Sequence, residues 1–596
     1  MKRIICTTLL VETSPQAMPL GAACIASALK ADSRIRDCCA VSLQDFSLED
    51  DSLASLPTVR DKALCIARSL AEQKPDCVCF SVYVWNHLLL EQASRALKEL
   101  LPAVRCIAGG PEVTAAPTAF NTFDYTIAGQ GECAVPALIY ELFFAQQNSY
   151  GAQQHELREA SVPGVYSLCA ATDAYTPRAP ETVAKNGDVT RAVPLFPQQL
   201  ASPYLDGTLD PARYGGALWE LARGCPFKCS YCYESKGEQK IAYFPLERLE
   251  KELELFAKKD IAQVFVLDPT YNANKQRALT MLRLIEKKAP GIFFYFEARA
   301  EFIDRELSRA FSRIPCALQI GLQSADVAVL KNVHRTLDKK LFTKNIGFLN
   351  EAGVTFGFDV IYGLPGDSYA GFCRSIDFAL SLYPNNLELF CLSVLPGTTL
   401  HDDAAGFGMQ WQQEPPYHVI CTPQFGEREL SRAARLSRAT QLFYNEGRAV
   451  PWFNSILYPL QKKPAAFLED FAAFLETRHV RADQDCDGLL CSHADIERLQ
   501  CAFVEKAYRA QHLTALLPAA LDLIRMNGAV SRATADGAES LVPLSYHPND
   551  IMSEYALDIA YFTEICGRQT CCAHVFVGKN GVDWDLTEKQ SVRKKR

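Results

Sequence analysis

Three cysteines stand close together in the middle of the chain, in the segment RGCPFKCSYCYESK at residues 223–236. Cys225, Cys229 and Cys232 follow the spacing C-x-x-x-C-x-x-C. A structural zinc site normally uses four ligands, and no fourth Cys or His lies beside these three in the sequence. A disulfide would leave one thiol over, whereas a cubane iron–sulfur cluster could take three thiolates and keep one iron open. The spacing alone does not decide between a zinc site, a disulfide and an iron–sulfur cluster.

The other cysteines form a scattered background. The chain of 596 residues has 23 cysteines, and several alternate with apolar residues, as in DCVCFSVYVW. This pattern is typical of small buried side chains. The opening MKRIICTTLL meets Glu12 too early for a signal peptide and lacks a small-residue cleavage site. We therefore expect a cytoplasmic, reducing location and no disulfide framework.

Charge and composition limit the classes of partner that we expect. The net charge is −8, which argues against a nucleic-acid binder. Hydrophobic residues make up 48% of the chain, which is enough to build ordinary buried cores. No stretch approaches the ~18 apolar residues of a membrane-spanning helix. We expect no nucleic-acid partner and no membrane contact, and a length of roughly three or four domains.

Residues 1–150 alternate between buried strands and amphipathic helices. Strands are expected at 2–10, 38–46, 76–85, 104–112 and 123–132, with helices between them. Continuous apolar strands separated by helices predict an α/β domain with a doubly wound, flavodoxin-like parallel sheet. Ligands of such sheets bind beyond the carboxyl ends of the strands. The candidate binding residues there are Ser81, Tyr83, Gly109, Gly110, Gly129 and Gly131. The glycines could equally form tight turns in a domain without a ligand.

The rest of the chain divides into three parts. Residues 151–215 are rich in Pro, Ala and Gly and read as a linker. Residues 216–425 contain six strand–helix units, which predict a partial (β/α)6 barrel with its site at the carboxyl ends of the strands. Residues 426–596 read as a mostly helical domain. Polar residues at the barrel's strand ends are Asp268, Glu297, Arg299, Gln323 and Ser324.

The barrel region resembles the radical S-adenosylmethionine (SAM) superfamily, because Tyr231 fills the aromatic place in C-x-x-x-C-x-Φ-C. The resemblance implies that Cys225, Cys229 and Cys232 bind a [4Fe–4S] cluster whose fourth iron takes SAM. It also implies that SAM is cleaved to a 5′-deoxyadenosyl radical. Carried over by position, Asp268 would contact the SAM amine, and Glu297 and Arg299 its ribose or carboxylate. Gln323 and Ser324, with the segment VIYG at 360–363, would flank its ribose and adenine.

The first domain resembles the cobalamin-binding domains that precede radical SAM domains, through AGGPEVTAAP and DYTIAGQGE. It departs from the type whose motif D-x-H-x-x-G supplies a cobalt ligand. The sole histidine of residues 1–150 is His87, which lies outside any such motif. The resemblance therefore implies cobalamin without a protein histidine on its lower face.

Together the domains resemble cobalamin-dependent radical SAM enzymes, and the last third resembles a C-terminal extension of unassigned function. The resemblance implies an enzyme that abstracts a substrate hydrogen and methylates an unactivated carbon of a small molecule, supplied with electrons by a donor such as flavodoxin or ferredoxin. Radical cyclisation or rearrangement is the near alternative, and a non-catalytic cobalamin or cluster sensor is another. A methylthiotransferase is disfavoured because the first domain's cysteines lie mostly inside strands and helices.

A second group of cysteines lies in the tail. It comprises Cys486, Cys491, Cys501, Cys566, Cys571 and Cys572. An auxiliary iron–sulfur cluster is one interpretation, although the spacings match no ligand motif. Isolated packing cysteines are the other.

Overall fold

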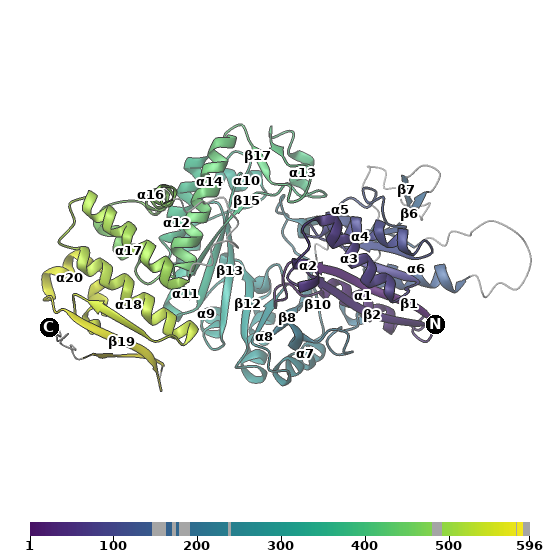
Figure 1. The fold of residues 1–596 in the computed structure, drawn as a ribbon, viewed down its shortest axis with the longest axis horizontal. Helices are drawn as coiled ribbons and strands as arrows, with labels where there is room; N and C mark the ends of the chain where they lie inside the picture. Colours follow the sequence, from purple (N-terminus) through teal and green to yellow (C-terminus); the bar gives the residue numbers. More distant parts are fainter. Residues whose placement is uncertain are drawn as a thin grey trace, which may run out of the picture. The chain divides into compact units, whose positions relative to one another are not determined.

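The structure is a computed structural model that describes residues 1–145, 162–169, 174–177, 191–192, 194–236, 240–478, 492–579 and 581–587 (Figure 1). The chain forms two compact units. The first consists of Met1–Leu318, Val333–Arg335 and Ser393–Val419, and the second of Gln319–Asn332, Thr336–Leu392 and Ile420–Arg596.

The first unit begins with a seven-stranded sheet in the order β2-β1-β3-β4-β5-β6-β7. Strands β1 to β5 pair in parallel, and β6 and β7 continue the sheet antiparallel. The strands are Lys2–Leu10 (β1), Cys39–Ser47 (β2), Cys77–Ser81 (β3), Arg105–Gly109 (β4), Tyr125–Ile127 (β5), Val165–Cys169 (β6) and Ala174–Pro177 (β7). Because β6 and β7 fall within residues 151–215, part of the predicted linker belongs to this sheet.

Helices cover both faces of this sheet (Figure 1). Ile4 and Cys6 of β1 pack with helices α1 (Leu20–Ala31) and α6 (Gly131–Phe143). The alternate residues Ile5 and Leu9 pack on the other face with α3 (Val59–Glu72) and α4 (His87–Leu100). Two short helices, α2 (Asp51–Ala54) and α5 (Pro111–Ala115), complete the domain. A parallel sheet buried on both faces confirms the predicted doubly wound fold.

The first unit also contains the start of the β/α region. Strand β11 pairs in parallel with both β8 and β12. These strands are Gly216–Trp219 (β8), Gln263–Val266 (β11) and Phe293–Ala298 (β12), and the helices are α7 (Leu246–Lys258), α8 (Lys275–Lys288) and α9 (Arg305–Phe311). The short strands β9 (Ala222–Arg223) and β10 (Ala242–Tyr243) pair antiparallel. The single-turn helix η4 (Tyr233–Lys236) lies between them in sequence.

The second unit continues the alternation. Strand β13 (Cys316–Gln323) leads into it, and β14 (Thr355–Tyr362) pairs in parallel with β15 (Asn386–Cys391). The helices here are α10 (Val327–Asn332), α11 (Lys339–Ala352) and α12 (Tyr369–Leu380). Parallel strands alternating with helices confirm the predicted α/β class of this region.

The last part of the second unit is mostly helical, as predicted. Its helices are α14 (Glu427–Thr440), α15 (Phe453–Leu460), α16 (Pro464–Thr477), α17 (His493–Ala510), α18 (Leu517–Asp536), α19 (Pro548–Ile551) and α20 (Ile559–Ile565). An antiparallel sheet that the sequence analysis did not predict closes it, in the order β18-β19-β20 (yellow in Figure 1). Its strands are Ser540–Leu544, Cys571–Gly578 and Gly581–Leu586.

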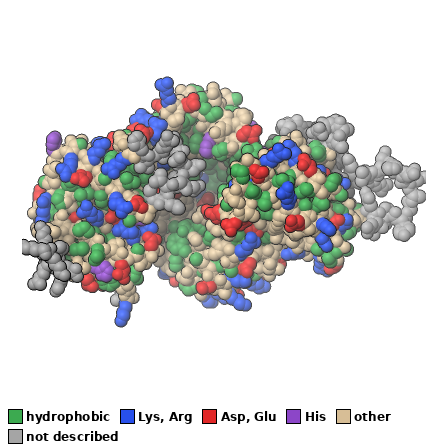
Figure 2. Space-filling view, in the orientation of Figure 1, with side chains coloured by type: hydrophobic (Ala, Val, Ile, Leu, Met, Phe, Trp, Pro, Cys, Tyr) green, Lys and Arg blue, Asp and Glu red, His purple; other side chains and the backbone are tan. Residues whose placement is uncertain are grey.

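The surface shows no segregation of charge on the face in view. Figure 2 shows Lys and Arg side chains interspersed with Asp and Glu there. Among the described residues, no helix has both the length and the apolar character needed to cross a bilayer.

Candidate functional site

The three clustered cysteines lie on one loop, which follows β9 and ends at η4. All three are free thiols in the structure, so they form no disulfide there. Cys225 and Cys229 are buried and Cys232 is half-buried. Burial raises the pKa of the Cys225 thiol, and it raises that of Cys232 to about 11. Metal binding at this loop must therefore displace protons from the thiols.

Backbone hydrogen bonds hold this loop in place. The Ser230 N–H donates to the carbonyl of Val333 at 3.1 Å, and the Ser230 carbonyl accepts from the Leu400 N–H at 2.8 Å. Within the loop, the Cys232 N–H donates to the Cys229 carbonyl at 3.1 Å. The loop is thus fixed by two segments that are far from it in sequence.

Two arginines contact the aromatic residues between the cysteines. Arg335 Nη1 donates to the Tyr231 hydroxyl at 3.0 Å. The guanidinium of Arg299 lies 3.9 Å from the centroid of the Phe227 ring, within cation–π range. Arg299 also pairs with Glu301, with Nη2 to Oε1 at 2.6 Å. Positive charge therefore borders the loop from two sides, which suits an anionic thiolate-bound group.

The Asp268 side chain holds the backbone that leads into the cysteine loop. Its Oδ1 accepts hydrogen bonds from the N–H groups of Leu221 at 2.8 Å and Ala222 at 3.0 Å. Both residues lie just before the cysteine loop. The side chain is 5% exposed, and burial raises its pKa to about 7. A carboxyl already committed to two backbone groups is first of all a structural support for the cysteines.

The other predicted SAM residues are divided between the units. Glu297 is exposed on β12, in the same unit as the cysteines. Gln323 and Ser324 belong to the second unit. Gln323 ends β13 with φ of 65°, a strained conformation for a residue with a side chain. Its Oε1 is buried with no hydrogen-bond partner among the described residues. Ser324 is fully buried, 3.4 Å from Ser375 through their hydroxyls.

The loop supplies three thiols, which is the donor set of a cubane cluster with one iron left open. In such a cluster each cysteine binds a different iron. Three free thiols on one loop fit this requirement. Within the described part of the chain, no three His, Cys, Asp or Glu side chains are arranged as a site for one metal ion.

A cavity of about 590 Å³ lies in the first unit, at the carboxyl ends of the parallel strands. Its lining includes Thr8 and Leu9 at the end of β1 and residues that follow β3, where the strand order of the sheet reverses. This is the position at which doubly wound sheets bind ligands. All six residues predicted for cobalamin line it: Ser81, Tyr83, Gly109, Gly110, Gly129 and Gly131.

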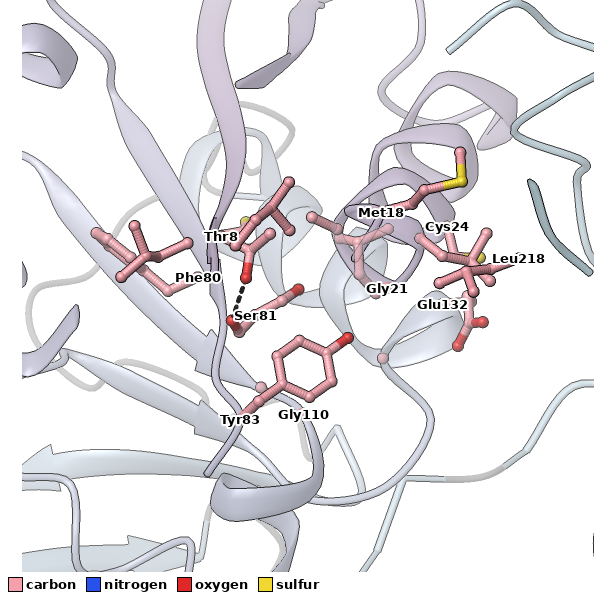
Figure 3. Close-up of a pocket in the computed structure, with 18 of the residues that line it drawn as sticks. Thr8, Met18, Gly21, Cys24, Phe80, Ser81, Tyr83, Gly110, Glu132 and Leu218 are labelled. Carbon is pink, nitrogen blue, oxygen red and sulfur yellow. Dashed lines mark hydrogen bonds between the residues drawn. The ribbon is translucent and has the colours of Figure 1, made fainter. Parts of the chain in front are cut away.

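Close packing explains why glycines line this cavity. Gly110 has φ of 114°, and a Cβ there would come within 2.4 Å of the Val82 carbonyl oxygen. Figure 3 shows the Tyr83 ring reaching toward Gly21, where a Cβ would meet the Tyr83 hydroxyl at 2.4 Å. The dashed bond in Figure 3 is donated by the Thr8 hydroxyl to the Ser81 carbonyl at 2.8 Å. Gly21 and Gly110 thus allow Tyr83 and the Val82 backbone to pack closely in the cavity wall.

The mouth of the cavity carries exposed apolar side chains. Val11, Trp85 and Leu267 all line the cavity, and they are 48%, 53% and 42% exposed. The Trp85 ring stacks on Tyr83 with centroids 4.6 Å apart and planes 5° from parallel. Grouped exposed hydrophobic side chains at a cavity mark a binding surface.

His87 does not line this cavity but joins a buried network beside it. Its Nδ1 lies 3.2 Å from Glu112 and its Nε2 lies 3.3 Å from Glu91. Glu112 in turn accepts from the Tyr417 hydroxyl at 2.8 Å. Burial alone would lower the pKa of His87, but its two carboxylate partners raise it to about 9. The network ties α4 and α5 to the segment that contains Tyr417.

Three residues important at these sites were missed from the sequence. Arg335 contacts Tyr231, and Glu112 holds His87 and Tyr417. Arg223 lines the cavity and pairs with Glu132. Two of the three had a local signal, because Arg223 stands two residues before Cys225 and Glu112 lies within AGGPEVTAAP.

The tail cysteines remain an open prediction. Cys486 and Cys491 lie outside the described residues. Cys501, Cys566, Cys571 and Cys572 are free thiols. The Cys571 thiol donates to the Tyr546 carbonyl at 3.3 Å, which is an ordinary packing contact.

Comparison with known proteins places two domains on the chain. The model of the B12 binding domain matches residues 7–139, the doubly wound domain with the cavity. The model of the radical SAM superfamily matches residues 219–379, which include the cysteine loop.

Two of the curated relatives are methyltransferases. The 2-(S-pantetheinyl)-carbapenam-3-carboxylate methyltransferase of Streptantibioticus cattleyicolor is 27% identical over 369 residues, covering 56% of this chain and 50% of that protein. The cobalamin-dependent radical SAM methyltransferase TokK of Streptomyces tokunonensis is 26% identical over 394 residues, covering 60% and 53%. The chain thus spans about half the length of these curated relatives.

Solved structures share the fold. OxsB, a cobalamin-dependent SAM radical enzyme solved with aqua-cobalamin, aligns with a TM-score of 0.57 at 12% identity, covering 86% of this chain and 81% of OxsB. TsrM of Kitasatospora setae, a radical SAM methyltransferase solved with cobalamin and a [4Fe–4S] cluster, aligns with a TM-score of 0.52 at 16% identity, covering 71% and 79%. At these identities the likeness concerns the fold.

Asp268 can be tested as an anchor. Asp268→Ala leaves two buried N–H groups unpaired, so we expect a loss of about 2–4 kcal/mol of unfolding free energy and less iron bound on reconstitution. Asp268→Asn keeps an accepting oxygen and should retain most of both. Denaturant unfolding and iron analysis measure these effects. Equal losses in the two variants would instead mean that the carboxylate charge itself is needed.

The His87 network predicts a pH dependence. Because the folded pKa of His87 is above its unfolded value of about 6.5, its stabilisation is complete below pH 6.5 and is lost as pH rises through about 9. His87→Gln should cost about 1–3 kcal/mol at pH 6 and much less at pH 10. Unfolding curves across this range measure the difference. His418→Gln, in the same unit, is the control: burial lowers the pKa of His418, so this change should cost no more at pH 6 than at pH 10.

Proposed function

Because the chain belongs to the cobalamin-binding radical SAM superfamily, we propose that it is a cobalamin-dependent radical SAM methyltransferase that acts on a small molecule. The two curated relatives described above are methyltransferases, which supports this proposal. The observation that carries it is that one compact unit contains both the three-thiol loop and a cavity lined by all six predicted cobalamin residues.

The loop would hold a [4Fe–4S] cluster through Cys225, Cys229 and Cys232. When bound, the cluster supplies the electron that cleaves SAM, and cobalamin supplies the methyl group. The chain's own part is to fix the thiols, which Asp268 and Ser230 do through backbone hydrogen bonds. An electron donor such as flavodoxin or ferredoxin would reduce the cluster.

SAM contacts are proposed at the loop's borders. Arg299 is held beside the loop by Phe227 and, through Nε and Nη2, by Glu301, so Nη1 would be its donor to a carboxylate there. Glu297 lies two residues away on β12 and could accept from an ammonium group. Gln323 and Ser324, in the second unit, stay predictions for the ribose and adenine.

The cavity would hold cobalamin. Cavities of this size enclose drug-sized ligands, and cobalamin is larger, so we expect part of it to fill the cavity and part to cover the mouth. The exposed apolar side chains Val11, Trp85 and Leu267 would then leave water. That the lower face of cobalamin lacks a protein histidine stays a prediction.

The finer reaction is methylation of an unactivated carbon. Radical chemistry is the means by which such a carbon becomes reactive, and the apolar walls exclude water from the site. A small-molecule substrate agrees with the relatives that bear the methyltransferase names. Cyclisation or rearrangement would use the same hydrogen abstraction but leave the product's mass without an added methyl group.

Metal content and SAM cleavage test this proposal together. Protein reconstituted without oxygen should hold about four irons and about one cobalt per chain, and should form 5′-deoxyadenosine after reduction. Changing Cys225, Cys229 and Cys232 to Ala should abolish iron binding and SAM cleavage while cobalt remains. Cys316→Ala, at another buried free thiol, is the matched control and should keep both. Iron without cobalt would remove the cobalamin mechanism, and no cleavage would favour a sensor.

Substitution of Trp85 tests whether cobalamin covers the mouth of the cavity. We expect Trp85→Ala to raise the Kd for hydroxocobalamin about tenfold, because a large apolar side chain then no longer leaves water on binding. Leu88→Ala removes a side chain of similar exposure that does not line the cavity, and should leave the Kd unchanged. Absorbance titration measures both, and thermal unfolding should change little in either. Equal Kd values would place the ligand away from this mouth.

A further inference from the structure

The wall of the cavity is built from two stretches that are distant in sequence. Most of it comes from residues 8–135 of the doubly wound domain, and the rest from Leu218, Glu220, Arg223 and Leu267 at the start of the β/α region. In Figure 3, Leu218 and Glu132 mark the part of the cavity where the two stretches meet. Both stretches belong to the first unit.

Arg223 makes the ion pair that crosses between these stretches. Its Nη1 lies 2.8 Å from Glu132 Oε1, in the first turn of α6, and 3.4 Å from Gln130 Oε1. On its own stretch, Nη2 lies 2.8 Å from Glu220 Oε2. One guanidinium thus connects the first turn of α6 with Glu220, the residue that follows β8. The fork of guanidinium donors suits this geometry, which a lysine could not reproduce.

The pair is largely out of water. The Arg223 side chain is 18% exposed and that of Glu132 is 9% exposed. A ligand that fills the cavity would remove the remaining water from the pair, and charges attract more strongly in a drier environment. Occupancy of the cavity therefore favours the paired arrangement.

Arg223 also leads directly into the cysteine loop. It is the last residue of β9, and Gly224, with φ of 93°, turns the chain into Cys225. Asp268 holds the N–H groups of Leu221 and Ala222, just before Arg223. Only Gly224 separates Arg223 from Cys225, so a change in the pairing of Arg223 acts on the backbone next to the first cluster cysteine.

We propose that Arg223 is a positioning residue that couples occupancy of the cobalamin cavity to the order of the cysteine loop, through its ion pair with Glu132. This inference rests on the proposed function, because it takes cobalamin as the ligand of the cavity. Coupling between two sites is reciprocal, so an ordered cluster loop would also favour cobalamin binding.

Amide hydrogen exchange on the cluster-loaded protein tests the coupling. In the unaltered chain, saturating hydroxocobalamin should slow exchange in a peptide covering residues 224–234 by roughly fivefold or more, the lower end of typical coupling between sites. Peptides from the cavity wall at residues 107–115 should slow as well. In Arg223→Gln and in Glu132→Gln, the wall should still be protected at saturation while the loop is not.

Arg248→Gln is the matched control. Like Arg223, Arg248 pairs with a glutamate, is 17% exposed and lies near the Phe244 ring, but it does not line the cavity. It should keep the cobalamin-dependent protection of the loop even if it lowers stability. Loop protection that survives in Arg223→Gln and Glu132→Gln, or that is lost equally in Arg248→Gln, overturns the inference. Absence of any wall protection in the unaltered chain would instead contradict cobalamin binding, and so the proposed function.

Discussion

Both candidate sites depend on one constraint of parallel sheets: every strand ends at the same edge, so the loops that follow the strands gather there. In the doubly wound domain this gathers the ends of β1, β3, β4 and β5 around one cavity. The strands themselves are buried on both faces by α1, α6, α3 and α4. Function is therefore confined to loops, whose positions are set by a rigid core.

The loops are then shaped by backbone requirements. Gly110 can approach Val82 only because it has no side chain, and its positive φ favours glycine. At the cysteine loop the support is of another kind, since a buried carboxylate and two distant backbone segments hold residues 221–232 in place. Close backbone packing shapes one site, and hydrogen bonds position the thiols at the other.

Buried charge connects these loops to one another. Arg223 with Glu132 and Glu220, and His87 with Glu91 and Glu112, are each largely removed from solvent. Removing one partner from such a group leaves a buried charge without its counter-charge. This costs far more free energy of folding than an ion pair contributes at a surface. Both groups lie beside the cavity or line it, and each joins an element of the doubly wound domain to a segment from later in the chain. Their placement makes the geometry of the first unit sensitive to single side chains.

What the sequence by itself determined was local. The cysteine spacing, the aromatic Tyr231 between the cysteines and the alternation of strands and helices all lie within short windows, where backbone geometry leaves few alternatives. The same holds for the glycines, whose positions after strands already predicted the edge on which the cavity lies. The tertiary structure alone decided which distant residues meet: Arg223 with Glu132, Tyr231 with Arg335, and Asp268 with the backbone before the cysteines. It also decided that β6 and β7 extend the first sheet and that β18–β20 close the chain's last part. The physical reason is that ion pairs, backbone anchors and edge-strand pairing depend on which surfaces pack together, and a residue's neighbours in sequence do not encode that packing.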